Sequence, residues 1–291
     1  MKPPFTYFGG KTALADRIVA MLPEHEHYVE PFAGSLAILL AKPPSRMETV
    51  NDADGDLMNF WHILRDRTDD LLKVAALTPH SRGEHIASFA PAKDDLERAR
   101  RIWVRLTQGR GGHTSRRTGW RYYQDPRGSH SSMPEYVDAY LERICPAARR
   151  LRGVSLECKP AAEIIRDYGR HPDTLIYADP PYLGSVRTWG NNYAVEMRSD
   201  EEHGELLEAL LGCRAAVVLS GYASALYDGM LTTWFRREIA TQTGNGGKER
   251  ARTEVIWSNR PFPQGSLFDL AADASFVAAE STPAEKDGDA A

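Results

Sequence analysis

The sequence predicts an α/β fold with a mostly helical insertion. Short apolar runs that end in turn residues alternate with helical patterns in both the first and the last part of the chain. Between about residues 71 and 152, helical periodicity dominates and no alternation typical of strands is evident. Two strand-like runs, Trp234 to Ile239 and Thr253 to Trp257, surround a glycine-rich stretch and predict a closing hairpin.

The charge balance is close to neutral but uneven along the chain. The 291 residues are enough for one large domain with an insertion, and 36 basic residues face 40 acidic ones, for a net charge of -4. The stretch from Leu270 to Ala291 holds five acids and one base, so it carries this whole net charge. Such a composition predicts a disordered acidic tail over residues 263–291.

Cysteine use and hydropathy exclude several classes of protein. The three cysteines show no Cys-x-x-Cys spacing, which argues against a disulfide framework and a structural zinc site and favours a reducing compartment. We expect no metal ion in the site. No apolar run approaches the length of a membrane span, and the N-terminus lacks a signal-peptide pattern. We therefore expect a cytoplasmic protein without membrane contact.

The first candidate site is the stretch Tyr7-Phe8-Gly9-Gly10-Lys11, which precedes a helical pattern. Two glycines before a helix permit a ligand to approach the backbone closely. A lysine in the first turn can reach a carboxylate or a phosphate. The alternative is a flexible loop with a solvated lysine.

The next stretch resembles the start of a nucleotide-binding half. Tyr28 to Ser35 predicts a buried strand and a tight turn at Gly34, followed by a helix over Leu36 to Ala41 capped by Ser35. The three-glycine dinucleotide fingerprint is missing, so a pyrophosphate loop is not predicted.

A second strand, Met47 to Val50, ends in Asn51-Asp52-Ala53-Asp54. Asp52 lies 18 residues after Gly34, about where such folds place the acid that binds ribose hydroxyls. Either acid could instead cap the helix that follows from Gly55 to Arg65, and we expect this role for Asp54 more than for Asp52.

The insertion combines helices with a basic loop. Helices are predicted over Asp94 to Leu106 and over Pro134 to Leu151, the second bent at Pro146. Between them, the loop from Thr107 to Tyr123 is rich in glycine, arginine and aromatic residues, a composition suited to phosphates and base edges. Its arginines are Arg110, Arg116, Arg117 and Arg121. The alternative is a solvated surface loop.

The α/β pattern then returns. A strand at Val154 to Leu156 and a helix over Ala161 to Tyr168 lead to the apolar run Thr174 to Ala178. A helix beginning at Ser199 carries a capping box with Glu202, and Ala215 to Leu219 predicts the next strand.

The apolar run at Thr174 to Ala178 ends in Asp179, Pro180, Pro181 and Tyr182. The exocyclic amine of adenine or cytosine is a poor nucleophile because its lone pair is delocalised into the ring. A carboxylate can accept one amine hydrogen, and the Pro180 carbonyl, whose direction the two prolines restrict, can accept the other. Tyr182 can stack on the base, which implies a base taken out of its stack. The alternative is an ordinary strand-end turn.

Taken in this order, the motifs resemble the Dam-like (D12 class, alpha group) family of DNA adenine-N6 methyltransferases, over the body of the chain from Tyr7 to Asn259. Tyr7 to Lys11 is similar to the family's Tyr-x-Gly-Gly-Lys, and Glu30 to Gly34 to its first cofactor motif. Asp52 falls at the ribose-binding acid, and Asp179 to Tyr182 is similar to the catalytic tetrapeptide.

The resemblance implies a class I methyltransferase fold with a mixed seven-stranded, Rossmann-like sheet. It implies S-adenosylmethionine as methyl donor and S-adenosylhomocysteine as product. The implied cofactor-binding residues are Tyr7, Lys11, Glu30, Phe32, Gly34, Asp52 and Asp179. The implied catalytic residues are Asp179, Pro180, Pro181 and Tyr182, which would orient N6 of a flipped adenine; whether Asp179 also removes a proton is left open.

The same resemblance divides the chain. Residues 1–70 and 157–262 would form the catalytic domain, and residues 71–156 the target recognition domain. The four loop arginines are then candidates for contact with duplex DNA. We expect a monomer or a weak dimer, with a cognate restriction endonuclease as a further candidate partner.

Three other functions stay open. Cytosine-N4 enzymes share the tetrapeptide, although Ser is commoner there at the position of Asp179. An adenine methyltransferase acting on RNA would use the same chemistry. A DNA-binding protein that has lost catalysis is a rival of a different class, against which Lys11, Asp52, Asp179 and Tyr182 argue because all are intact.

Overall fold

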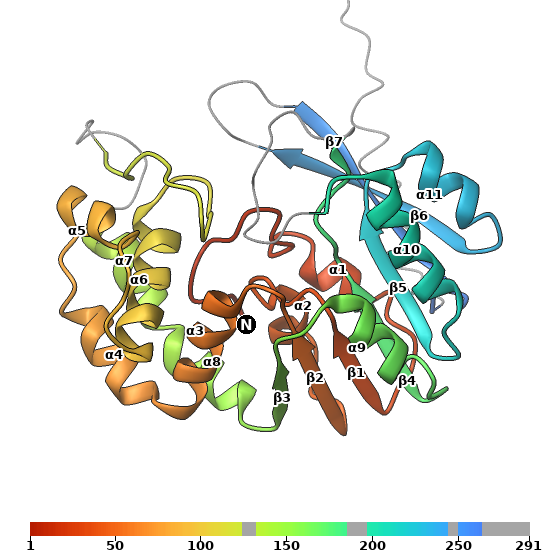
Figure 1. Ribbon diagram of the computed structural model, residues 1–291, viewed down its shortest axis with the longest axis horizontal. Helices are drawn as coiled ribbons and strands as arrows, with labels where there is room; N and C mark the ends of the chain where they lie inside the picture. Colours follow the sequence, from red (N-terminus) through yellow and green to blue (C-terminus); the bar gives the residue numbers. More distant parts are fainter. Residues whose placement is uncertain (124–131, 185–196, 244–249, 264–291) are drawn as a thin grey trace, which may run out of the picture.

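The computed structural model describes residues 1–123, 132–184, 197–243 and 250–263 (Figure 1). Except for residue 263, the expected acidic tail lies outside this part of the chain.

One seven-stranded sheet organises the molecule, in the order β3-β2-β1-β4-β5-β7-β6 (Figure 1). Strands β1 to β5 pair in parallel, whereas β7 runs antiparallel between β5 and β6. The predicted class I fold with its mixed sheet and closing hairpin is therefore confirmed. The strands are β1 (His27–Glu30), β2 (Met47–Asn51), β3 (Val154–Glu157), β4 (Thr174–Ala178), β5 (Ala216–Gly221), β6 (Phe235–Thr243) and β7 (Arg250–Ser258).

The strand order reverses between β1 and β4. The chain moves outward from β1 to β2 and β3, then returns to pair β4 with the other side of β1, where Val29 faces Ile176. Parallel strands place their carboxyl ends at one edge, and a crevice forms at such a reversal. The residues that follow β1, β2 and β4 consequently meet there.

Alternate residues of the central strands enter two separate cores. In β4, Leu175 and Tyr177 belong to the core under α1, α2 and α3, whereas Ile176 and Ala178 belong to the core under α9, α10 and α11. All five residues of β4 are buried, as expected for a strand covered on both faces.

Two sets of helices lie on different sides of the molecule. Figure 1 shows α4 to α7 gathered to one side of the sheet, while α9 to α11 lie against it.

Within the described residues, no helix combines the length and the apolar character of a membrane span. The helices are α1 (Ala15–Val19), α2 (Ala37–Ala41), α3 (Gly55–Asp66), α4 (Thr68–Ala76), α5 (Arg82–Ala87), α6 (Asp95–Gln108), α7 (Met133–Leu141), α8 (Ile144–Leu151), α9 (Ala161–Tyr168), α10 (Asp200–Leu211) and α11 (Ala225–Met230).

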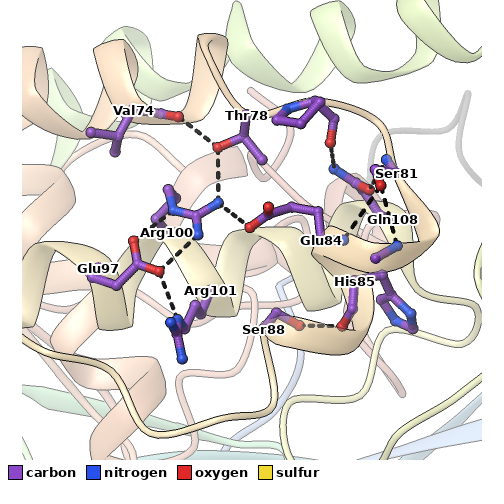
Figure 2. Close-up of polar contacts among 12 residues, drawn as sticks. Val74, Thr78, Ser81, Glu84, His85, Ser88, Glu97, Arg100, Arg101 and Gln108 are labelled. Carbon is purple, nitrogen blue, oxygen red and sulfur yellow. Dashed lines mark hydrogen bonds and ion pairs between the residues drawn. The ribbon is translucent and has the colours of Figure 1, made fainter.

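A polar network joins α5 to α6 (Figure 2). Arg100 on α6 donates to both carboxylate oxygens of Glu97 at 2.7 Å and lies 2.6 Å from the carboxylate of Glu84 on α5. Hydrogen bonding by Arg100 lowers the pKa of Glu97 to about 2. At the end of α6, the Gln108 side chain accepts from the backbone N–H of Ser81, which caps α5. The two helices are thus fixed together where the basic loop begins.

Two predicted helix caps, at Asp54 and Ser199, are confirmed, and the structure adds a third at Asp94. Asp54 accepts from the backbone N–H groups of Asp56 and Leu57 at the start of α3. Asp94 caps α6, and Ser199 forms a capping box at the start of α10. Caps of this kind stabilise a helix by about 1 kcal/mol.

Two details of the helix predictions are wrong. Ser35 does not cap α2, because Leu36 occupies the N-cap position in a left-handed conformation, with φ 55°, and gives no side-chain cap. The predicted helix bent at Pro146 is two helices, α7 and α8, separated at Glu142 and Arg143. Pro146 lies in the first turn of α8. Backbone N–H groups in the first turn have no acceptor within the helix, so a proline costs no hydrogen bond there.

Candidate active site

A cavity of about 340 Å³ opens at the carboxyl ends of β1, β2 and β4. Its wall comes from the N-terminal segment, the turns after these strands, and the start of α9. The structure brings together all seven residues that the sequence singles out for the cofactor: Tyr7, Lys11, Glu30, Phe32, Gly34, Asp52 and Asp179.

The turn after β1 is held by the acid after β2. Gly34 has φ +46°, and its N–H donates to Asp52 at 3.0 Å. The other carboxylate oxygen of Asp52 accepts from the Asp54 N–H at 3.0 Å. A Cβ on Gly34 would meet the Tyr7 ring at 3.0 Å, so the turn and the N-terminal segment pack too closely for a side chain. Burial raises the pKa of Asp52 to about 6.

Asn51, which no sequence motif indicated, connects two of the turns at this edge of the sheet. Its amide nitrogen donates to the carbonyls of Pro31 and Lys159, and its oxygen accepts from the Lys159 N–H at 2.8 Å. The side chain is fully buried. It thereby joins the turns after β1 and β3, and the only sequence signal was a polar residue at the end of an apolar strand.

Lys11 extends from the N-terminal segment into the site. Its ammonium donates to the Asp179 carboxylate at 2.5 Å, to the Tyr182 hydroxyl at 2.8 Å and to the Gly9 carbonyl at 3.2 Å. Burial disfavours the charged form, but Asp179 and Glu254 outweigh it and raise the pKa of Lys11. The lysine is a buried, charged partner of the tetrapeptide and not a solvated side chain.

The tetrapeptide begins directly after β4. Burial raises the pKa of Asp179 to about 6, against the lowering effect of Lys11. Asp179 and Pro181 line the cavity. The Tyr182 ring stacks on Tyr222 with centroids 4.2 Å apart, and Tyr222, which follows β5, was missed by the sequence reasoning. Two stacked aromatic rings from neighbouring strand ends therefore lie close to the Lys11 ammonium, which is 5.0 Å from the Tyr182 ring centroid.

Glu254, in the middle of β7, was also missed as a site residue. Its carboxylate accepts from Ser220 at 2.7 Å and from the Tyr182 hydroxyl at 3.2 Å, and lies 3.6 Å from the Lys11 ammonium. Only 3% of the residue is exposed. An acid beside the apolar run Val255 to Trp257 was the signal that could have found it, because a buried carboxylate needs partners.

The basic loop leaves the cavity side and forms a short hairpin. Gly109 and Trp120 form an antiparallel bridge, and the Arg121 N–H donates to the Gln108 carbonyl at 2.7 Å. Arg116 and Arg117 are exposed. The guanidinium of Arg110 lies 5.6 Å from the Tyr122 ring centroid, while that of Arg121 lies 4.9 Å from the Tyr136 ring centroid, against α7. None of these four arginines lines the cavity.

The base of the loop is anchored to the cavity wall. The Thr114 hydroxyl donates to the carboxylate of Asp54 at 2.8 Å, the Gly112 carbonyl accepts from the Phe8 N–H at 2.9 Å, and His113 stacks on Phe8. Asp54 and Phe8 both line the cavity. The loop that carries the arginines and the pocket therefore share a wall.

Arg82 is an arginine of this surface that the sequence reasoning missed. Its guanidinium lies 4.9 Å from the Trp120 ring centroid and 5.4 Å from that of Tyr122. His80 stacks on Trp120 with centroids 4.5 Å apart. Arg82 and His80 come from the start of α5 and the segment before it, far from the loop in sequence, which is why composition alone did not reveal the cluster.

Comparison with known proteins gives the same family as the motifs. The model of the D12 class N6 adenine-specific DNA methyltransferases matches residues 7–103. The DNA adenine methylase of Escherichia coli (strain K12) is 25% identical over 275 residues, covering 87% of this chain and 93% of the relative. The DNA adenine methylase of Salmonella typhi is 24% identical, with the same coverage of both chains. Among solved structures, an rRNA methylase from Streptococcus thermophilus aligns over 88% of this chain and 98% of its own, with 9% identity and a TM-score of 0.36.

The family match begins at Tyr7 and takes in Lys11, Glu30 and Asp52. The resemblance to the Dam-like family is thereby confirmed, together with the expected enzyme class, an adenine-specific DNA methyltransferase. Methyltransferases of this class use S-adenosylmethionine, and their substrate is DNA.

Proposed function

We propose that this chain binds S-adenosylmethionine in the cavity and moves its methyl group to N6 of an adenine flipped out of duplex DNA, at a specific sequence. The observation that carries the proposal is the Asp179 carboxylate, which lines the cavity and is held by Lys11. The same lysine donates to the hydroxyl of Tyr182, whose ring stacks on Tyr222.

The cavity suits the cofactor in charge and in polarity. S-adenosylmethionine carries a sulfonium and an ammonium against a single carboxylate, and the cavity is lined by one lysine and six acids. These acids are Glu30, Asp52, Asp54, Asp179, Glu202 and Glu205. Apolar groups on the same wall, including Phe32, Ile38 and Leu206, offer a surface for an adenine ring.

Each cofactor-facing residue has a proposed role. Lys11 and Glu30 flank the charged amino-acid end, and Phe32 and Gly34 shape the turn beneath it. Asp52 holds the ribose: both of its oxygens already accept backbone N–H bonds, and each keeps acceptor capacity for a hydroxyl. When bound, the cofactor supplies a methyl group that its sulfonium has already activated, so the proposed reaction requires no metal ion.

The tetrapeptide would hold the target amine. Asp179 and the Pro180 carbonyl each accept one hydrogen from N6, which directs the nitrogen lone pair toward the cavity. The Tyr182 and Tyr222 rings stack with centroids 4.2 Å apart, and we propose that the flipped adenine is held against this aromatic pair. Flipping a base costs a few kcal/mol, which such stacking offsets at about 1–3 kcal/mol per base.

Residues 71–156 would form the target recognition domain, and residues 1–70 with 157–262 the catalytic domain. The exposed Arg116 and Arg117 are proposed to contact the DNA backbone, with Arg110 and Arg121 near them. The pairing of Arg121 with Tyr136 favours a role in holding the hairpin over a direct phosphate contact. We propose that the chain acts in the cytoplasm as a monomer or weak dimer, with a cognate restriction endonuclease as an open partner.

Replacement of Asp179 tests the catalytic assignment. We expect Asp179→Ala and the shape-preserving Asp179→Asn to lower the rate of methyl transfer by at least about 10²–10³-fold, because N6 loses its acceptor and Lys11 its partner. Duplex binding, measured by fluorescence anisotropy, should change less than about threefold. Asp173→Asn, which alters an exposed acid at the opposite end of the same strand, is the matched control. Substantial methylation by either Asp179 variant would refute the assignment.

A further inference from the structure

Three ionisable side chains from distant parts of the chain, Lys11, Asp179 and Glu254, meet at the cavity wall. Lys11 lies between two carboxylates, 2.5 Å from Asp179 and 3.6 Å from Glu254. Lys11 and Asp179 line the cavity, whereas Glu254 lies behind them on β7. Lys11 and Glu254 are 5% and 3% exposed, so water screens this group poorly.

The group has one more negative charge than positive when all three side chains are ionised. Burying an uncompensated charge is costly, and an excess carboxylate in a poorly hydrated site is stabilised by a cation. The carboxylate of Asp179 faces the cavity, so a cationic ligand there would balance the group. Hydrogen bonds from Ser220 and Tyr182 hold Glu254 in place but bring no charge.

We propose that Glu254 is a positioning residue whose charge makes the cavity select the cationic form of the cofactor over the neutral product. With Glu254 ionised, Lys11 is neutralised by one carboxylate and the charge of Asp179 remains to face a sulfonium. S-adenosylhomocysteine has lost that positive charge and cannot balance the group. This inference rests on the proposed use of S-adenosylmethionine.

Glu254 has two properties that a variant can separate: it is a hydrogen-bond acceptor and it carries a charge. Tyr182 donates to Glu254 at 3.2 Å and accepts from Lys11 at 2.8 Å, so the phenol is held from both sides. A purely structural Glu254 would serve only as a hydrogen-bond acceptor for Ser220 and Tyr182. A glutamine has an acceptor oxygen in the same place, which makes Glu254→Gln a test of charge alone.

The experiment is isothermal titration calorimetry of the full chain with three ligands. S-adenosylmethionine carries the sulfonium, sinefungin carries a protonated amine at the same position and transfers no methyl group, and S-adenosylhomocysteine is neutral there. We expect Glu254→Gln to weaken binding of both cationic ligands about tenfold and to change the affinity for S-adenosylhomocysteine less than about threefold.

Two further variants sharpen the comparison. Glu254→Asp keeps the charge and should keep the ratio between the affinities for the cationic ligands and for S-adenosylhomocysteine. Ser220→Ala removes a hydrogen bond to Glu254 without changing the charge, and it should keep the same ratio. Glu254→Asn makes the same test if the glutamine variant does not fold. Equal weakening of all three ligands, or no change in the ratio, would overturn the proposal. Failure of the wild-type chain to bind S-adenosylmethionine would instead reject the proposed function.

Discussion

Glu30 is a buried acid whose ionisation opposes folding. Burial raises its pKa to about 8, despite the hydrogen bond that Tyr28 donates to it at 2.8 Å. In the unfolded chain the carboxyl ionises near its ordinary value of about 4.3. Between these values the folded protein binds the additional proton, so this residue makes the free energy of unfolding fall as the pH rises from about 4.3 to 8.

Glu30→Gln should therefore stabilise the ligand-free protein at neutral pH. The glutamine oxygen still accepts from Tyr28, and no carboxyl has to be protonated on folding. We expect the free energy of unfolding of the variant to be a few kcal/mol higher than that of the wild type at pH 8. This difference should shrink toward pH 5, by up to about 1.4 kcal/mol per pH unit. Urea unfolding at pH 5, 6, 7 and 8 measures it, and parallel pH profiles for both proteins would show that Glu30 is not the group responsible.

For the individual site residues, the sequence indicated the right residue types but not their partners. Lys11, Asp52 and Asp179 were recognisable because each follows a turn or strand that predicts a ligand. The Lys11–Asp179 bond spans 168 residues and the Tyr182–Glu254 bond spans 72, so no local pattern could pair them. Tyr222 and Asn51 were missed for the same reason, since their importance depends on what the fold places beside them.

Among the elements, the basic loop is anchored at a glycine that tolerates no side chain. Gly112 has φ +68°, and a Cβ there would lie 2.8 Å from the backbone of Phe8 and of Tyr7. These neighbours are main-chain atoms of the cavity wall and cannot move aside as a flexible side chain would.

Gly112→Ala should consequently disturb the loop and the pocket together. We expect a loss of about 1–3 kcal/mol in stability, from the left-handed backbone and the clash, and weaker cofactor binding because the segment carrying Tyr7 and Phe8 is displaced. Gly119→Ala is the matched control in the same loop, since among the described residues its Cβ would meet only the Arg110 side chain, at 3.7 Å. Thermal unfolding and calorimetry check both effects. If both variants lost the same stability and the same affinity for the cofactor, the close packing of Gly112 against Tyr7 and Phe8 would not be what anchors the loop.

Element types were predictable because strands and helices have different hydrophobic periods. The failures were local exceptions that tertiary packing imposes. Leu36 adopts a left-handed conformation that leucine rarely takes, and its side chain is fully buried, so the core overrides the local preference. The separation of α7 from α8 was signalled by Pro146, which cannot donate to the carbonyl of Glu142 four residues earlier, but the sequence pattern did not show whether the helix would bend or divide.

For the whole molecule, the distribution of charge matters more than its sum. The net charge is -4, yet the stretch from Arg110 to Arg127 holds five arginines and one acid. A protein of negative net charge can bind DNA when its cations are gathered at one surface. Within that stretch, Arg116 and Arg117 are exposed beyond the anchored base of the loop.

Replacing Arg116 and Arg117 together by alanine should weaken duplex binding and flatten its dependence on salt. Each lost phosphate contact lowers the slope of log K against log salt by about 0.9. Arg46→Ala with Arg170→Ala is the control, because it removes the same charge from exposed positions before β2 and β4, outside residues 71–156 and at the edge of the sheet opposite the cavity. Anisotropy titrations from low to moderate salt distinguish the two pairs. If both double variants show the same slope of log K against log salt as the wild type, the loop arginines do not contact phosphates.

The most direct measurement is the identity of the methylated nucleoside. The purified chain is incubated with S-adenosylmethionine labelled in its methyl group and with mixed-sequence duplex DNA or RNA, and the products are digested and separated. The Asp179 site, the family match and the basic loop predict labelled N6-methyldeoxyadenosine from DNA, within one sequence context. Label found only in N4-methyldeoxycytidine, or only in RNA, would contradict that prediction.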